Sequence, residues 1–139
     1  MHYFYVAIGG ALGSILRVYL SSLIPRLLPG LGHLEALPKY FSEIPIAILI
    51  INITGCLLMG VFSQLLGVYQ PPSNSFELRS LLFSGFLGGF TTFSAFSLEF
   101  GLLWQKNLYI SAGLYSLFSF IFSIMAFFIG VKTVKCFYG

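Results

Sequence analysis

Four long apolar segments constrain the fold of this chain more than any other feature of its sequence. They run from Tyr3 to Ile24, Ile44 to Tyr69, Ser80 to Trp104 and Leu108 to Val131. Each meets the roughly 20 residues that an α-helix needs to cross a hydrocarbon core about 30 Å thick. Only 8% of the 139 residues are charged, whereas soluble domains carry about a quarter. We therefore expect an all-α membrane protein in which residues 1–139 form one domain of four transmembrane helices.

The connecting segments carry the residues that oppose helix formation. Pro25 to Glu43 contains three prolines, and Gly67 to Glu77 contains a Pro-Pro pair. Both are expected to be loops, the first with an interfacial turn around Leu34 to Phe41. Cys56 falls within the second helix and Cys136 in the tail after the fourth, so the two cysteines predict no disulfide framework, and neither is assigned a role.

The positive charges are balanced across the expected membrane. With four spans, both termini and the second loop share one side, which carries Arg79, Lys132 and Lys135. The opposite side carries Arg26, Lys39 and Lys106. Because orientation follows an excess of lysine and arginine on one side, this balance predicts no fixed orientation. Insertion in both directions explains it, and chance in a small count is the alternative. No basic cluster indicates a nucleic-acid partner.

The third apolar segment contains a stretch, Gly85 to Glu99, that is a poor membrane helix. Three glycines and the β-branched pair Thr91 and Thr92 weaken helical propensity within this window. A break in a membrane helix persists only where protein, water or an ion serves the freed N–H and C=O groups. The stretch therefore predicts a broken helix with a binding site. Alternatively, Gly85 and Gly89 let two helices approach closely, and spacing alone favours neither interpretation.

Two polar side chains within the first and second segments need partners. Arg17 is a charged group inside a span, where such residues pair with protein or face water unless they snorkel to the headgroups. A functional or pairing role is the favoured interpretation. Asn52 offers two N–H donors, which suit an anion, and an interhelical hydrogen bond is the alternative.

A stripe of hydroxyl groups runs along the fourth segment. The hydroxyls recur every four residues, at Ser111, Tyr115, Ser119 and Ser123. Hydroxyls can donate to an anion without introducing a full charge. A single membrane serine often bonds to its own helix, so the regular spacing is the informative feature.

Three motifs are similar to those of one family. Gly85 to Glu99 closely resembles the third transmembrane segment of the Fluc (CrcB) fluoride channels. Gly9 to Arg17 resembles the family's first-helix motif, and Asn52 to Cys56 resembles its second-helix motif. Because the motifs occur in the family's order in a chain of the family's length, the resemblance covers nearly the whole sequence.

The resemblance implies an antiparallel, dual-topology homodimer with a third helix broken mid-membrane and a structural, non-transported Na⁺ at the dimer centre. The backbone carbonyls of Gly88 and Thr91 match the positions of the sodium ligands. Phe93 and Phe96 match paired phenylalanines, whose positive ring edges can meet a partly dehydrated anion. With neighbouring hydroxyls added, the implied fluoride pathway comprises Asn52, Thr92, Phe93, Ser94, Phe96, Tyr115, Ser119 and Ser123.

The expected function is passive export of fluoride from the cytoplasm through the cell membrane. The resemblance places Arg17 near the aqueous vestibule and the subunit interface, and Glu99 is expected at the pore mouth. The expected partners are fluoride, membrane lipid and a second copy of the chain in inverted orientation.

Two other functions fit a small four-helix membrane protein. A proton-coupled multidrug exporter needs an acidic residue deep in a span, whereas Glu99 lies near an edge. A non-transporting membrane subunit would carry no flux on its own. An enzyme is not expected, because the sequence shows no grouping of nucleophile, base and orienting residue and no metal-ligand spacing.

Overall fold

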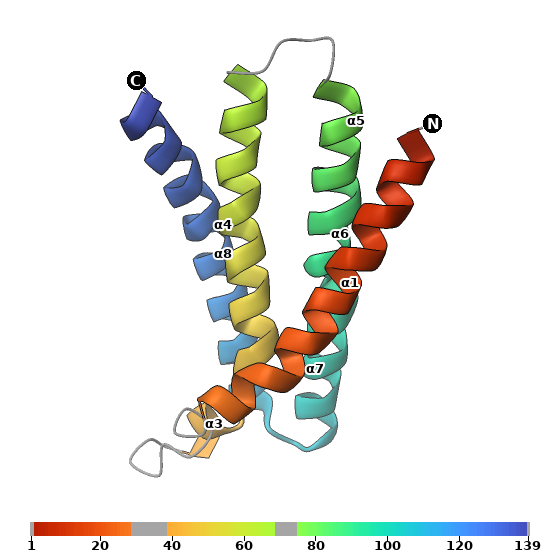
Figure 1. Ribbon diagram of the computed structural model, residues 1–139. Helices are drawn as coiled ribbons and strands as arrows, with labels where there is room; N and C mark the ends of the chain where they lie inside the picture. Colours follow the sequence, from red (N-terminus) through yellow and green to blue (C-terminus); the bar gives the residue numbers. More distant parts are fainter. Residues whose placement is uncertain (1, 29–38, 69–74, 139) are drawn as a thin grey trace.

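Four apolar spans run the length of the molecule, and α1 begins at the same end of the bundle at which α8 finishes (Figure 1). The computed structural model describes residues 2–28, 39–68 and 75–138. The first, second and fourth spans are α1 (His2–Leu27), α4 (Ile46–Val68) and α8 (Tyr109–Tyr138). The third is assembled from α5 (Ser75–Arg79), the π-helix η1 (Ser80–Leu87), α6 (Gly88–Phe90) and α7 (Phe93–Gln105). Within these residues, the prediction of an all-α protein with four spans is confirmed.

The first helix extends past its predicted end. α1 includes Pro25 and finishes at Leu27, so the loop does not begin at the proline. Proline has a helical φ but no N–H to donate, and the helix ends two residues after it. The interfacial turn expected around Leu34 lies mostly outside the described residues, which contain a short helix, α3 (Lys39–Ser42), at its carboxyl end.

The fourth helix also extends past its predicted end. α8 runs seven residues beyond Val131, because lysine and threonine end an apolar segment without ending a helix. The assignment of Cys136 to a tail after this helix is therefore wrong. Its exposed thiol lies in the last turns of α8.

The third span loses helical geometry for two residues. Thr91 has φ −101° and ψ 128°, and Thr92 has φ −137° and ψ 133°, so both are extended. The expected interruption is present, but its predicted cause is only partly right. Gly85, Gly88 and Gly89 all lie in helical turns, and the chain leaves the helix after them. The β-branched threonines favour the extended region, and glycine tolerates a helix when packing compensates for its propensity.

The glycines serve the close approach of two helices. A Cβ atom at Gly13 would overlap the carbonyl oxygen of Phe86, and a Cβ at Gly89 would overlap that of Gly10. The backbone of α1 therefore lies directly against η1 and α6, as close packing through small residues requires. The same device joins α4 to α8, where a Cβ at Gly60 would overlap the carbonyl oxygen of Phe127. Both interpretations of the glycine-rich stretch are thus partly correct.

An arginine side chain connects the end of α4 to the start of the third span. The Arg79 guanidinium donates a hydrogen bond of 2.6 Å to the Leu66 carbonyl oxygen. The last carbonyls of a helix lack partners within it and carry a partial negative charge, so an arginine is suited to this position. The contact fixes the third span against α4 at the end of the bundle opposite α3 (Figure 1).

We expect Gly13→Ala to destabilise the protein because its methyl group would collide with the backbone of η1, which cannot rotate away. Overpacking of this kind costs about 1 to 3 kcal/mol. Gly113→Ala is the matched control, since Gly113 is also helical and has no atom near the position of its Cβ. Thermal unfolding in detergent should show a lower Tm for Gly13→Ala and an unchanged or higher Tm for Gly113→Ala. Equal Tm values for the two variants would contradict this packing.

Candidate functional site

The interruption is held by the two threonine side chains. The Thr92 hydroxyl oxygen accepts a hydrogen bond of 3.2 Å from the Ala95 N–H, which makes Thr92 the N-cap of α7. The Thr91 hydroxyl and its N–H both donate to the Leu87 carbonyl oxygen at 2.9 Å. The extended pair is therefore fixed by local hydrogen bonds on both sides. It is an ordered feature of the chain.

The end of α6 leaves carbonyl oxygens available. Helix termini always leave their last carbonyls without intrahelical partners. The Gly89 carbonyl accepts a hydrogen bond of 3.2 Å from Nε of half-buried Arg17. Within the described residues, the carbonyl oxygens of Gly88 and Thr91 accept no hydrogen bond. Arg17 thus pairs with protein rather than snorkelling, and two hard oxygen ligands stay open beside it.

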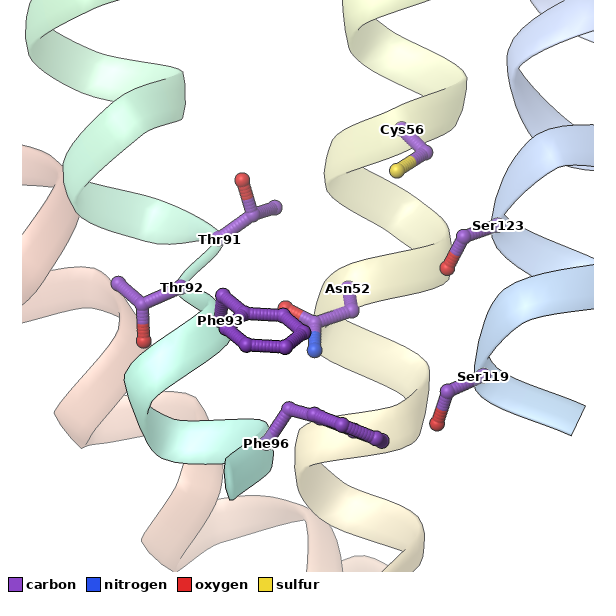
Figure 2. A pocket seen from close by; sticks show the side chains of 8 residues that line it. All are labelled: Asn52, Cys56, Thr91, Thr92, Phe93, Phe96, Ser119 and Ser123. Atoms are coloured by element: carbon purple, nitrogen blue, oxygen red, sulfur yellow. The ribbon is translucent and has the colours of Figure 1, made fainter. Parts of the chain in front are cut away.

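A cavity of about 230 Å³ lies beside the interruption (Figure 2). Residues from α4, from the interruption with the start of α7, and from α8 form its walls. They are Asn52, Cys56, Thr91, Thr92, Phe93, Phe96, Ser119 and Ser123. Figure 2 shows the hydroxyls of Ser119 and Ser123 pointing from α8 toward α4, where Asn52 and Cys56 are one turn apart. The hydroxyl groups of Ser119 and Ser123 and the amide of Asn52 therefore line the same cavity as the two phenyl rings.

The two phenyl rings have different surroundings. Their centroids are 5.4 Å apart with an interplanar angle of 32°. Phe96 is half-buried and also packs on Tyr115, with centroids 5.1 Å apart. Phe93 is 81% exposed, so it forms the open side of the cavity. A protein neighbour or lipid must cover this ring in the membrane.

Three hydroxyls of the stripe on α8 are buried without a partner. The side chains of Ser111 and Tyr115 are fully buried, and Ser119 is 8% exposed. Among the described residues, none of the three hydroxyls has a hydrogen-bond partner. A buried polar group left unpaired costs about 1 to 3 kcal/mol. Tyr115 and Ser119 are one turn apart and can serve each other, whereas Ser111 needs a ligand or ordered water as its partner.

The structure brings most of the predicted site residues together. Six of the eight predicted pathway residues line the cavity, and Tyr115 lies beside it through its contact with Phe96. Ser94 is exposed outside the lining, and half-buried Glu99 is not part of the wall either. Cys56 is the residue that sequence reasoning missed. Its spacing of four from Asn52, which repeats one helix face, was the signal for it.

A cation at this site would depend on backbone oxygens. The described residues contain no group of three or more His, Cys, Asp or Glu side chains that could hold a metal. The free carbonyls of Gly88 and Thr91 are hard oxygen donors, which suit a small hard cation. Gly88 is exposed at the surface of the chain. A cation bound to its carbonyl oxygen would therefore also contact the neighbour that covers this surface.

Comparison with known proteins agrees with this geometry. Residues 4–131 match the family described as "CrcB-like protein, Camphor Resistance (CrcB)". The chain is 38% identical over 130 residues to the fluoride-specific ion channel FluC of Rhizobium leguminosarum bv. trifolii, covering 94% of this chain and 93% of the relative. It is 39% identical over 130 residues to FluC of a Caulobacter species, covering 94% and 91%. It is 33% identical over 132 residues to FluC 1 of Staphylococcus aureus, covering 95% of each chain.

These matches span nearly the full length of both partners and include every element that forms the cavity. The described part of the chain has four spans long and apolar enough to cross a membrane. The chain is a multi-pass membrane protein that belongs to the CrcB family, the family of the FluC fluoride channels.

Proposed function

We propose that this protein is a fluoride-selective channel that exports fluoride passively from the cytoplasm through the cell membrane. The observation that carries the proposal is the cavity beside the interruption, which the hydroxyls of Ser119 and Ser123, the Asn52 amide and two phenyl rings line together. The relatives that match the chain over nearly its whole length are named fluoride-specific ion channels. Their name and the donor chemistry of the cavity support the same function.

The cavity offers the chemistry that a small hydrated anion requires. Fluoride is a strong hydrogen-bond acceptor, so a selective passage must replace its water with donors. Ser119 and Ser123 supply hydroxyls, and the Asn52 amide supplies two N–H donors without a charge that would trap the ion. The ring edges of Phe93 and Phe96 carry partial positive charge and bind weakly enough to release it. An interior-negative potential favours anion exit by about 2.3 kcal/mol per 100 mV, so export needs no fuel.

A second copy of the chain would cover the exposed side of the site. In lipid, the open carbonyl of Gly88 and the exposed Ser94 would lack partners, and each unsatisfied backbone group costs several kcal/mol. The ring of Phe93, the residue before Ser94, is also exposed. The equal division of lysine and arginine between the two sides supports a partner of inverted orientation. A two-fold axis through the interruption would place both copies of this surface against each other.

The carbonyls at the interruption fit a sodium ion. Gly88 and Thr91 would hold it from each copy, and both oxygens are open in the described chain. The ion would supply positive charge that compensates the converging carbonyl dipoles and holds the two copies together. Arg17, bonded to the neighbouring Gly89 carbonyl, holds α6 in the position that exposes these oxygens.

The function makes a direct demand on the purified protein. Reconstituted in liposomes loaded with fluoride or chloride, it should release fluoride at least a hundredfold faster than chloride under the same potential, measured with ion-selective electrodes. Equal release of both anions would contradict the selectivity that the donors and rings are argued to produce. Absence of all flux would instead favour a non-transporting membrane subunit.

Cys56 provides a test of whether the cavity is the passage. Methyl methanethiosulfonate transfers a methylthio group to a thiol, and this group would occupy part of the space between Asn52 and Ser123. Treatment should lower fluoride efflux several-fold in the wild type and in Cys136→Ala, whose substitution lies on the exposed end of α8. Cys56→Ala should conduct and resist the reagent. Equal inhibition of Cys56→Ala and wild type would contradict a passage through this cavity.

Sodium should stabilise the folded protein if the carbonyls bind it. A ligand at a hundred times its Kd adds about 2.7 kcal/mol to the free energy of unfolding. We expect the Tm to be several degrees higher in NaCl than in N-methyl-D-glucamine chloride of equal ionic strength, with KCl giving a smaller effect. Identical Tm values in the three salts would contradict the sodium site. They would not bear on the fluoride pathway, which the efflux experiments test.

A further inference from the structure

Ser111 belongs to the hydroxyl stripe but does not line the cavity beside the interruption. It lies one turn before Tyr115 on α8, and its hydroxyl is fully buried without a partner in the described part of the chain. Twelve residues separate Ser111 from Ser123, which corresponds to about 18 Å along the helix axis. The stripe therefore continues beyond Phe96 and Tyr115 toward the amino end of α8.

A second cavity, of about 290 Å³, opens at this end of the stripe. Ser111 lines it together with Tyr40 of α3 and with the turn that joins α7 to α8. The turn contributes Asn107 and Leu108 to the wall, and the first residues of α8 contribute Tyr109 and Ile110. Ser111 therefore borders the second cavity, Ser119 and Ser123 border the first, and Tyr115 lies between them in the stripe.

Asn107 is held with its donors available. Its φ of 59° is left-handed, a conformation that asparagine tolerates better than most residues. The Tyr109 hydroxyl donates a hydrogen bond of 2.8 Å to the Asn107 side-chain oxygen. This contact engages the acceptor of the amide and leaves its two N–H donors for another group.

The electrostatics of this end favour an anion. The first turn of α8 begins at Tyr109, so the positive end of a 30-residue helix lies at the cavity wall. Exposed Lys106 immediately precedes Asn107. Ser111, whose buried hydroxyl has no partner among the described residues, Asn107 and the amino end of α8 all border this cavity, which supports anion binding more strongly than a helix terminus alone.

We propose that this second cavity is a mouth of the anion passage, in which Asn107 and Ser111 bind fluoride before or after it crosses the Tyr115–Phe96 contact. The proposal rests on the proposed channel function and adds a binding site to it. Asn107 donates to a still hydrated ion at the surface, and Ser111 replaces the next water inside. The hydroxyl stripe then carries the ion to Ser119 and the first cavity.

Fluoride efflux from liposomes tests the buried donor. Ser111→Ala removes one hydroxyl and should lower the rate at least tenfold. Ser116→Ala is the matched control on the same helix, because the Ser116 hydroxyl already donates to the Ala112 carbonyl oxygen at 3.0 Å. It should stay within twofold of wild type. A folded, monodisperse Ser111→Ala protein with wild-type efflux would overturn the proposal.

The exposed donor gives a test that does not depend on a buried substitution. Asn107→Asp keeps the acceptor for Tyr109 but replaces N–H donors with negative charge, and should lower fluoride efflux at least threefold. Gln105→Glu adds the same charge to an exposed residue outside the wall and should stay within twofold. Equal rates for Asn107→Asp and wild type would overturn the mouth while leaving the channel intact. A wild-type protein without fluoride efflux would overturn the channel function itself.

Discussion

The need to satisfy backbone polar groups within a membrane is the constraint on which this structure depends. A helix meets it along its length, and only an interruption exposes carbonyl oxygens to a ligand. Here the interruption is two residues long, and Thr91 and Thr92 close most of the gap with their own hydroxyls. Within the described residues, the carbonyl oxygens of Gly88 and Thr91 accept no hydrogen bond, and the ring of Phe93 is 81% exposed. The proposed ion would bind these carbonyl oxygens, and the proposed inverted copy would cover this ring.

The packing of α1 makes the interruption possible. Glycines on both sides bring the backbone of α1 against η1 and α6, so the third span is held by backbone contact up to the point where it leaves the helix. Arg17 then reaches from α1 to the Gly89 carbonyl. The same close approach at Gly60 fixes α8 against α4 and aligns the hydroxyl stripe with Asn52. Small residues thus set the positions from which the polar groups act.

The fold and most of the cavity were predictable because each depends on spacing along one helix. Asn52 and the hydroxyls of α8 repeat every four residues, which places them on single faces. The exact point of interruption was not predictable, since glycine propensity competes with packing against α1, and packing decided the outcome. Cys56 was not predicted to line the cavity because a single thiol in an apolar helix indicates no particular function. Its spacing of four residues from Asn52 nevertheless places it in the wall. The second cavity was not predictable because it depends on the left-handed conformation of Asn107, which no periodic pattern in the sequence indicates.

An experimental structure of the protein in lipid nanodiscs with sodium tests the central claim most directly. The account predicts two copies of opposite orientation that meet at Thr91 and Thr92, with cation density between the carbonyl oxygens of Gly88 and Thr91 and with Phe93 covered. A third helix that continues unbroken through these residues and faces lipid, or copies of the same orientation without such density, would contradict it.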